Sequence, residues 1–146
     1  MELPVPLSFA FRWCTDYTAA DGKYAGEDDS INLRRKVVSK SKRHVVFENL
    51  YDVGGGWGWE RHTVTLVPPD RWHSHGIGNY HESVLDYALT AIDNHRTRLD
   101  MRWKTRRRGP SRGPRASGSR VEAYVAGLWR KRARHLERAY RQRRRA

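Results

Sequence analysis

Residues 44–67 read HVVFENLYDV, then GGG, then WGWERHTVTLV, and this stretch carries the clearest structural signal in the chain. Both outer runs are rich in β-branched and aromatic residues, which favour strands. Two such runs around a glycine cluster are typical of a β-hairpin. Pro68 and Pro69 end the second run, because proline cannot donate to a strand ladder. A hairpin over 44–53 and 57–67 is therefore the centre of the predicted fold.

The segments before this hairpin predict further strands. Leu7, Phe9, Phe11 and Trp13 alternate with smaller or polar residues, a period of two that indicates a half-buried strand. Residues 15–30 are polar and contain several glycines, which is typical of a loop. Val37 and its neighbour Val38 indicate the start of another strand.

The segments after the hairpin predict a loop and a helix. Residues 70–78 lack a clear period and are interpreted as a loop. Asn79 followed by Glu82 resembles a capping box. Apolar residues then recur at helical spacing and predict a helix from about residue 80 to 103, with a stripe formed by Leu85, Leu89, Ile92, Leu99 and Trp103.

Taken together, these patterns predict an α+β protein. The expected core is a small antiparallel sheet of three or four strands with a glycine-rich hairpin, covered by one helix, over residues 1–104. A basic linker rich in Gly, Pro and Ser follows over 105–119, and a basic amphipathic helix over 120–146 ends the chain. With 146 residues and a mean hydropathy of −0.89, the chain has room for one filled core.

The charge is concentrated at one end. The chain holds 29 Lys and Arg against 16 Asp and Glu. Residues 101–146 hold 17 of these basic and 2 of these acidic residues, a net charge of +15, whereas residues 1–100 have a net charge of −2. Such an asymmetric excess indicates a polyanionic partner. Arginine dominates, and its planar fork suits phosphate recognition.

The basic tail therefore predicts nucleic-acid binding, to DNA or RNA, through backbone contacts of low sequence specificity. The expected phosphate contacts are the arginines of the linker and of one helix face: Arg106, Arg107, Arg108, Arg112, Arg115, Arg130, Arg134, Arg138, Arg141 and Arg145. The opposite, apolar face of this helix must be covered. We expect it to pack on the amino-terminal sheet first, to form a homodimer second, and to lie on an anionic membrane third.

Trp57 and Trp59 at the hairpin tip are candidates for base stacking. They share one strand face, and the alternation of the strand favours the alternative that both belong to the core.

His73, His75, His81 and Glu82 are candidate metal ligands, because imidazole and carboxylate are ordinary ligands of divalent ions. If they converge, a metal-dependent nuclease is an alternative function. Their spacing matches no defined zinc motif, so chance clustering of loop histidines is favoured and no metal or cofactor is expected.

A third function remains open, that of a small accessory protein, for example from a phage, that binds an acidic surface of a protein partner. No catalytic motif occurs, and the single cysteine, Cys14, is expected to be inert packing, so an enzyme is not required. Without a signal peptide or an apolar run long enough to cross a bilayer, the chain is expected to be cytoplasmic.

Overall fold

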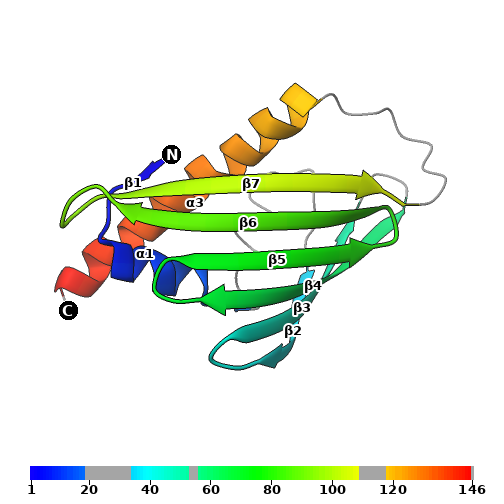
Figure 1. Cartoon of the computed structure of the whole chain (residues 1–146), viewed down its shortest axis with the longest axis horizontal. Coiled ribbons are helices and arrows are strands. Elements are labelled where there is room, and N and C mark those ends of the chain that lie inside the picture. The colour runs from blue at the N-terminus through cyan, green and yellow to red at the C-terminus, as the bar shows by residue number, and fades with distance from the viewer. Residues whose placement is uncertain (19–33, 53–55, 109–117, 146) are drawn as a thin grey trace.

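The computed structural model describes residues 1–18, 34–52, 56–108 and 118–145. Its centre is one antiparallel sheet of seven strands in the order β1-β7-β6-β5-β4-β3-β2. The strands are β1 (Glu2–Leu3), β2 (Arg34–Lys40), β3 (His44–Asp52), β4 (Trp57–Val67), β5 (Arg71–Gly78), β6 (His81–Ala91) and β7 (Thr97–Arg107). The helices are α1 (Leu7–Cys14) and α3 (Gly118–Arg145). Figure 1 shows the long strands β4 to β7 running side by side.

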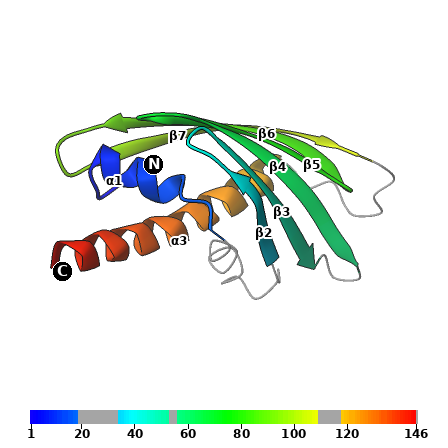
Figure 2. The same cartoon turned by 90° about the horizontal axis from the view of Figure 1, so that it is seen from below.

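Both helices lie on the same side of the curved sheet, with α3 crossing beneath it (Figure 2). We call this side the inner face and the opposite side the outer face. Val45 and Val64 of the sheet are fully buried in one core cluster with Phe9 of α1 and with Trp129 and Leu136 of α3. The carboxy-terminal helix is therefore part of the core, as expected from its apolar face.

The structure confirms the α+β class and the central hairpin, whose strands are β3 and β4. It also confirms the strand around Val37 and the carboxy-terminal helix. The predicted small sheet under one helix is wrong, since the sheet has seven strands and two helices cover it. The segment at 70–78, expected to be a loop, is strand β5.

The strand predicted over 7–13 is helix α1. The alternating pattern misled because its polar members, Ser8 and Arg12, are four residues apart. Residues at this spacing share one face of a helix as well as one face of a strand. Pro6 provides an extended residue at the N-cap, and Phe9 and Ala10 are buried.

The helix predicted over 80–103 is the hairpin β6–β7. Leu85, Leu89, Leu99 and Trp103 are separated by even numbers of residues, so they also share one face of a strand pair. Asp93 forms the turn between the two strands, where its carboxylate accepts hydrogen bonds from the backbone N–H of His95 and from Arg96. Asn79 does not cap a helix, because its side chain bonds the backbone of β4 at Trp57 and Trp59.

Candidate functional site

The inner face has an aromatic zone where α1 and α3 cover the sheet. Trp72 and Tyr87 stack with ring centroids 4.6 Å apart, and Tyr87 also meets Trp129 of α3 at 5.8 Å. At the edge of this zone, Phe9 meets Tyr140 at 4.9 Å. Burial raises the pKa of Tyr87 to about 12, so its hydroxyl stays neutral at physiological pH. This zone closes one end of the inner face with flat, apolar surfaces.

A polar cluster occupies the same face further along β3, β4 and β6. It is centred on Glu60, whose side chain is 15% exposed. The carboxylate accepts a hydrogen bond from the Asn49 amide at 2.8 Å and contacts Nε2 of His81 at 3.2 Å. Its Oε1 atom lies 3.0 Å from Nε2 of His62. Arg35 of β2 extends the cluster, because its Nε donates to Oδ1 of Asn49 at 2.9 Å.

Two glycines of β5 make room for this cluster. Gly76 pairs with His62 on one side and with Ser83 on the other. A β-carbon at Gly76 would lie 2.6 Å from Cε1 of His62 and 2.6 Å from Oγ of Ser83. Gly78 pairs with Glu60, and β6, which carries His81, lies on the other side of β5. With no side chain on β5 between them, Glu60 and His81 meet across the strand.

The cluster holds Glu60 in its ionised form. Burial alone raises the pKa of a carboxyl group, but the neighbouring imidazoles of His62 and His81 and the Asn49 amide outweigh that effect. The pKa of Glu60 therefore lies well below its ordinary value. A buried carboxylate is tolerated only when it is paired and hydrogen-bonded, and here both oxygens have partners.

Three buried polar atoms among the described residues have no hydrogen-bond partner: the hydroxyl of Tyr51, Nε2 of His62 and Nε1 of Trp103. Strand register places all three side chains on the inner face. An unsatisfied buried donor or acceptor costs about 1–3 kcal/mol. Three of them on the face that the helices cover are a feature that stability alone does not explain.

Two of these three atoms are donors. The indole nitrogen of Trp103 can only donate. Burial first, and then the nearby Glu60 and Tyr80, raise the pKa of Tyr51 to about 12, so its hydroxyl keeps its proton. The third atom, Nε2 of His62, lies 3.0 Å from Oε1 of Glu60. A partner for the two donors would have to present acceptors.

The tyrosine is fixed in place by the strand opposite. Its ring lies flat over Gly58, where a β-carbon would come within 2.1 Å of Cε2 of Tyr51. Leu85 and Trp103, which pair across β6 and β7, remain only partly buried although they face inward. Apolar surface therefore lies between the polar cluster and the aromatic zone.

The candidate metal ligands do not gather at one point. His73 pairs with Asp86 at 2.6 Å, and His75 pairs with Glu82 at 2.9 Å, both on the outer face. His81 lies on the inner face with Glu60. Glu82 also bonds Arg106 at 2.6 Å, and the His75 and Arg106 contacts lower its pKa. In the part of the chain that the structure describes, no three His, Cys, Asp or Glu side chains are placed to hold a metal ion.

Trp57 and Trp59 share one strand face, as predicted, but this is the outer face. They are 48% and 37% exposed, so the interpretation that favoured the core is wrong. Glu60 and His62 lie on the inner side of this strand, together with Val64 and Leu66, because they alternate with the tryptophans. The sequence signal of the site was therefore a carboxylate and an imidazole on the core side of a strand. This signal could be recognised only after the structure showed which residues of β4 point toward the core.

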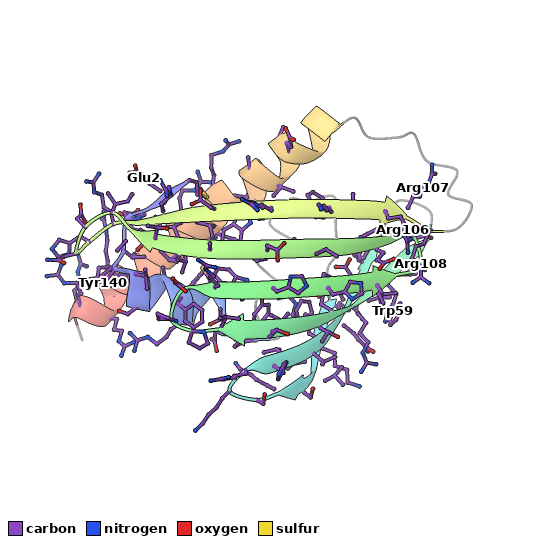
Figure 3. The ribbon with its side chains drawn as sticks, in the orientation of Figure 1. Glu2, Trp59, Arg106, Arg107, Arg108 and Tyr140 are labelled. Carbon is purple, nitrogen blue, oxygen red and sulfur yellow. The ribbon has the colours of Figure 1, made fainter. Side chains whose placement is uncertain are left out.

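The predicted phosphate-binding arginines lie in two places. Arg106 and Arg107 end β7, and Figure 3 shows them with Arg108 at the same end of the sheet as Trp59. The others that the structure describes are exposed on α3, on the side away from the core: Arg130, Arg134, Arg138, Arg141 and Arg145. Arg112 and Arg115 lie outside the described residues. Among the described helices, none is long and apolar enough to cross a membrane.

No protein-family model and no curated protein sequence matches this chain. Among solved structures, the fold is similar to that of the Zhui aromatase/cyclase from Streptomyces sp. R1128. The TM-score is 0.68 at 14% sequence identity, over 97% of this chain and 91% of the other.

This likeness contradicts the predicted nucleic-acid function. The prediction relied on a basic tail attached to a small separate domain. The helix of that tail is instead a core element, with Leu136 only 1% exposed. At this level of identity the comparison establishes the fold alone: a long helix held against a curved antiparallel sheet, the helix-grip arrangement.

Proposed function

We propose that the protein binds a small molecule with a flat, largely apolar body and several hydrogen-bond acceptors, held against the inner face of the sheet. The observation that carries this proposal is the presence of two buried donors without hydrogen-bond partners, the hydroxyl of Tyr51 and Nε1 of Trp103, beside the polar cluster of Glu60 and His62. Ligand sites combine apolar and aromatic walls with a few well-placed polar groups. The inner face has this composition. A solved structure with a similar fold is an aromatase/cyclase, which also favours a small-molecule ligand.

Each part of the face contributes differently to binding. The aromatic zone and the partly buried Leu85 and Trp103 offer apolar surfaces. A flat ring system that packs against them would remove its own apolar surface from water, which favours binding. The donors would then fix its orientation. A buried donor without a partner makes no hydrogen bond to water that ligand binding would have to break. An acceptor on the ligand therefore adds a complete hydrogen bond to the free energy of binding.

A matched pair of probes tests this proposal. 9-Fluorenone and fluorene have the same flat ring system, and only fluorenone carries a carbonyl acceptor. We expect fluorenone to bind more tightly than fluorene by about tenfold, equivalent to one hydrogen bond of about 1.4 kcal/mol. Quenching of tryptophan fluorescence measures both affinities.

Two substitutions locate the binding surface. Trp103→Phe and Tyr51→Phe each remove a donor while keeping an aromatic ring, and at least one should reduce the preference for fluorenone. Trp59→Phe is the matched control, because Trp59 lies on the outer face and is exposed. Absence of binding by the wild type, or equal affinities for the two probes in every variant, would refute the proposed function.

A further inference from the structure

Arg132 of α3 is a half-buried cation on the side of the helix that packs against the sheet. Trp129 and Leu136, which lie three residues before and four residues after it on the same helix face, are both buried. The guanidinium carbon of Arg132 lies 5.2 Å from the ring centroid of Trp129, and that ring meets Tyr87 of β6 at 5.8 Å. Arg132 therefore borders the aromatic zone, whereas Arg134 of the same helix is exposed.

The guanidinium of Arg132 has no carboxylate partner within the described part of the chain. Glu137 of the same helix pairs with Arg141 instead. An arginine side chain keeps its charge at every physiological pH, so the positive charge of Arg132 does not depend on a protonation step. A charge that is partly removed from water is costly unless an opposite charge compensates it. The inner face is therefore bordered by a fixed cation whose donors are available to an anion.

A second guanidinium lies near the same group of aromatic rings. The guanidinium carbon of Arg35 lies 4.2 Å from the ring centroid of Phe47, and Tyr17 stacks on that ring with centroids 5.4 Å apart. Burial raises the pKa of both Tyr17 and Tyr87. Arg35 and Arg132 both oppose this increase at each of the two hydroxyls. The two arginines therefore place positive charge around these hydroxyls, and this charge would attract an anionic group of a ligand.

Strand register connects this region with the donors of the proposed ligand site. Trp103 pairs with Leu85 across β7 and β6, and Tyr87 is the next inward-facing residue of β6 after Leu85. Residues two positions apart on one face of a strand are separated by about 7 Å. A flat ligand that lies over Leu85 is therefore within reach of both the Trp103 indole and the aromatic zone that Arg132 borders.

We propose that Arg132 binds a carboxylate of the ligand, so that the ligand is a flat aromatic acid and not a neutral molecule. This inference rests on the proposed function and names the class of its ligand. A planar guanidinium matches a planar carboxylate and can donate two parallel N–H···O hydrogen bonds to it. Carboxyl groups have an ordinary pKa of about 4, so the ligand is already ionised at neutral pH. Binding of this kind breaks no covalent bond and needs no proton transfer.

The probes for this proposal are the positional isomers of 9-fluorenone carboxylic acid, each compared with its own carboxamide. The amide has nearly the same shape as the acid but carries no charge. At neutral pH we expect the wild type to bind at least one acid about tenfold or more tightly than its amide, as is typical of hydrogen bonds to charged groups. Quenching of tryptophan fluorescence measures the affinities. Arg132→Met should remove most of this preference, because methionine keeps an unbranched apolar side chain but removes the charge.

Two further variants separate a specific contact from general attraction to a basic protein. Arg134→Met is the matched control, because it removes one charge from the exposed side of the same helix and should leave the preference for the acid unchanged. Arg132→Lys keeps the charge but loses the planar fork, so it should retain only part of the preference. An equal loss of preference in Arg132→Met and Arg134→Met, or no loss in either variant, would overturn the assignment.

Binding of neutral 9-fluorenone separates this inference from the proposed function. Retained binding of fluorenone by Arg132→Met shows that the inner face is still formed in this variant. If the wild type binds fluorenone but prefers none of the acids to its amide, the carboxylate site is refuted while the proposed function stands. If the wild type binds neither fluorenone nor any of the acids, both proposals fail.

Discussion

The ring of His62 lies against Gly76 so closely that a β-carbon there would come within 2.6 Å of Cε1 and 2.9 Å of Nδ1. The same β-carbon would lie 2.6 Å from Oγ of Ser83 on the neighbouring strand. The position of the imidazole therefore depends on the absence of a side chain at position 76.

Gly76→Ala is expected to destabilise the protein by about 1–3 kcal/mol, the usual cost of overpacking a filled interior. Urea unfolding measures the change. Gly127→Ala is the control, since a β-carbon at Gly127 of α3 meets nothing within 4 Å. Alanine favours a helix over glycine by about 0.5–1 kcal/mol, so this variant should be slightly more stable than the wild type. Equal effects at the two glycines would contradict the packing described for His62.

The stability of the protein should depend on pH through Glu60. The pKa of Glu60 is lower in the folded protein than the ordinary value of 4.5. Its stabilising contribution is therefore fully present above about pH 4.5 and is lost as the pH falls toward the folded pKa. Unfolding free energies measured from about pH 7 to about pH 3 should fall more steeply for the wild type than for Glu60→Gln. Parallel curves would show that the cluster does not hold the carboxylate ionised.

The role of α3 as a core element has its own test. Leu136→Ala should cost about 2–5 kcal/mol, as expected for a fully buried leucine. Arg138→Ala, two residues further along on the exposed side of the helix, should change stability by less than about 0.5 kcal/mol. Thermal or urea unfolding compares the two. A small effect of Leu136→Ala would mean that α3 does not pack on the sheet as described.

The comparison of sequence with structure shows which patterns carry fold information. The hairpin of β3 and β4 could be predicted because two runs of strand-favouring residues flank a glycine cluster, and both features indicate a hairpin. The hairpin of β6 and β7 could not, because a four-residue spacing such as Leu85 to Leu89 satisfies a helix stripe and one strand face equally. In α1, the four-residue spacing of Ser8 and Arg12 led to the opposite error, because a helix was predicted to be a strand.

The candidate site was harder to predict than the fold. Glu60 and His62 are ordinary polar residues in the sequence. They become candidate site residues only if their side of β4 points toward the core. Trp57 and Trp59 favoured the wrong facing, because two tryptophans are usually buried. The cluster also needs His81 and Asn49 from other strands, and strand register cannot be read from one sequence.

The most direct test of the proposed function is the NMR signal of the Trp103 indole N–H when 9-fluorenone is added. The chain has six tryptophans, and the Trp103 signal is identified as the one lost in Trp103→Phe. We predict that this signal shifts as the buried N–H gains an acceptor, while those of Trp57 and Trp59 on the outer face stay in place. A shift of the two exposed indoles with an unchanged Trp103 signal would contradict binding on the inner face.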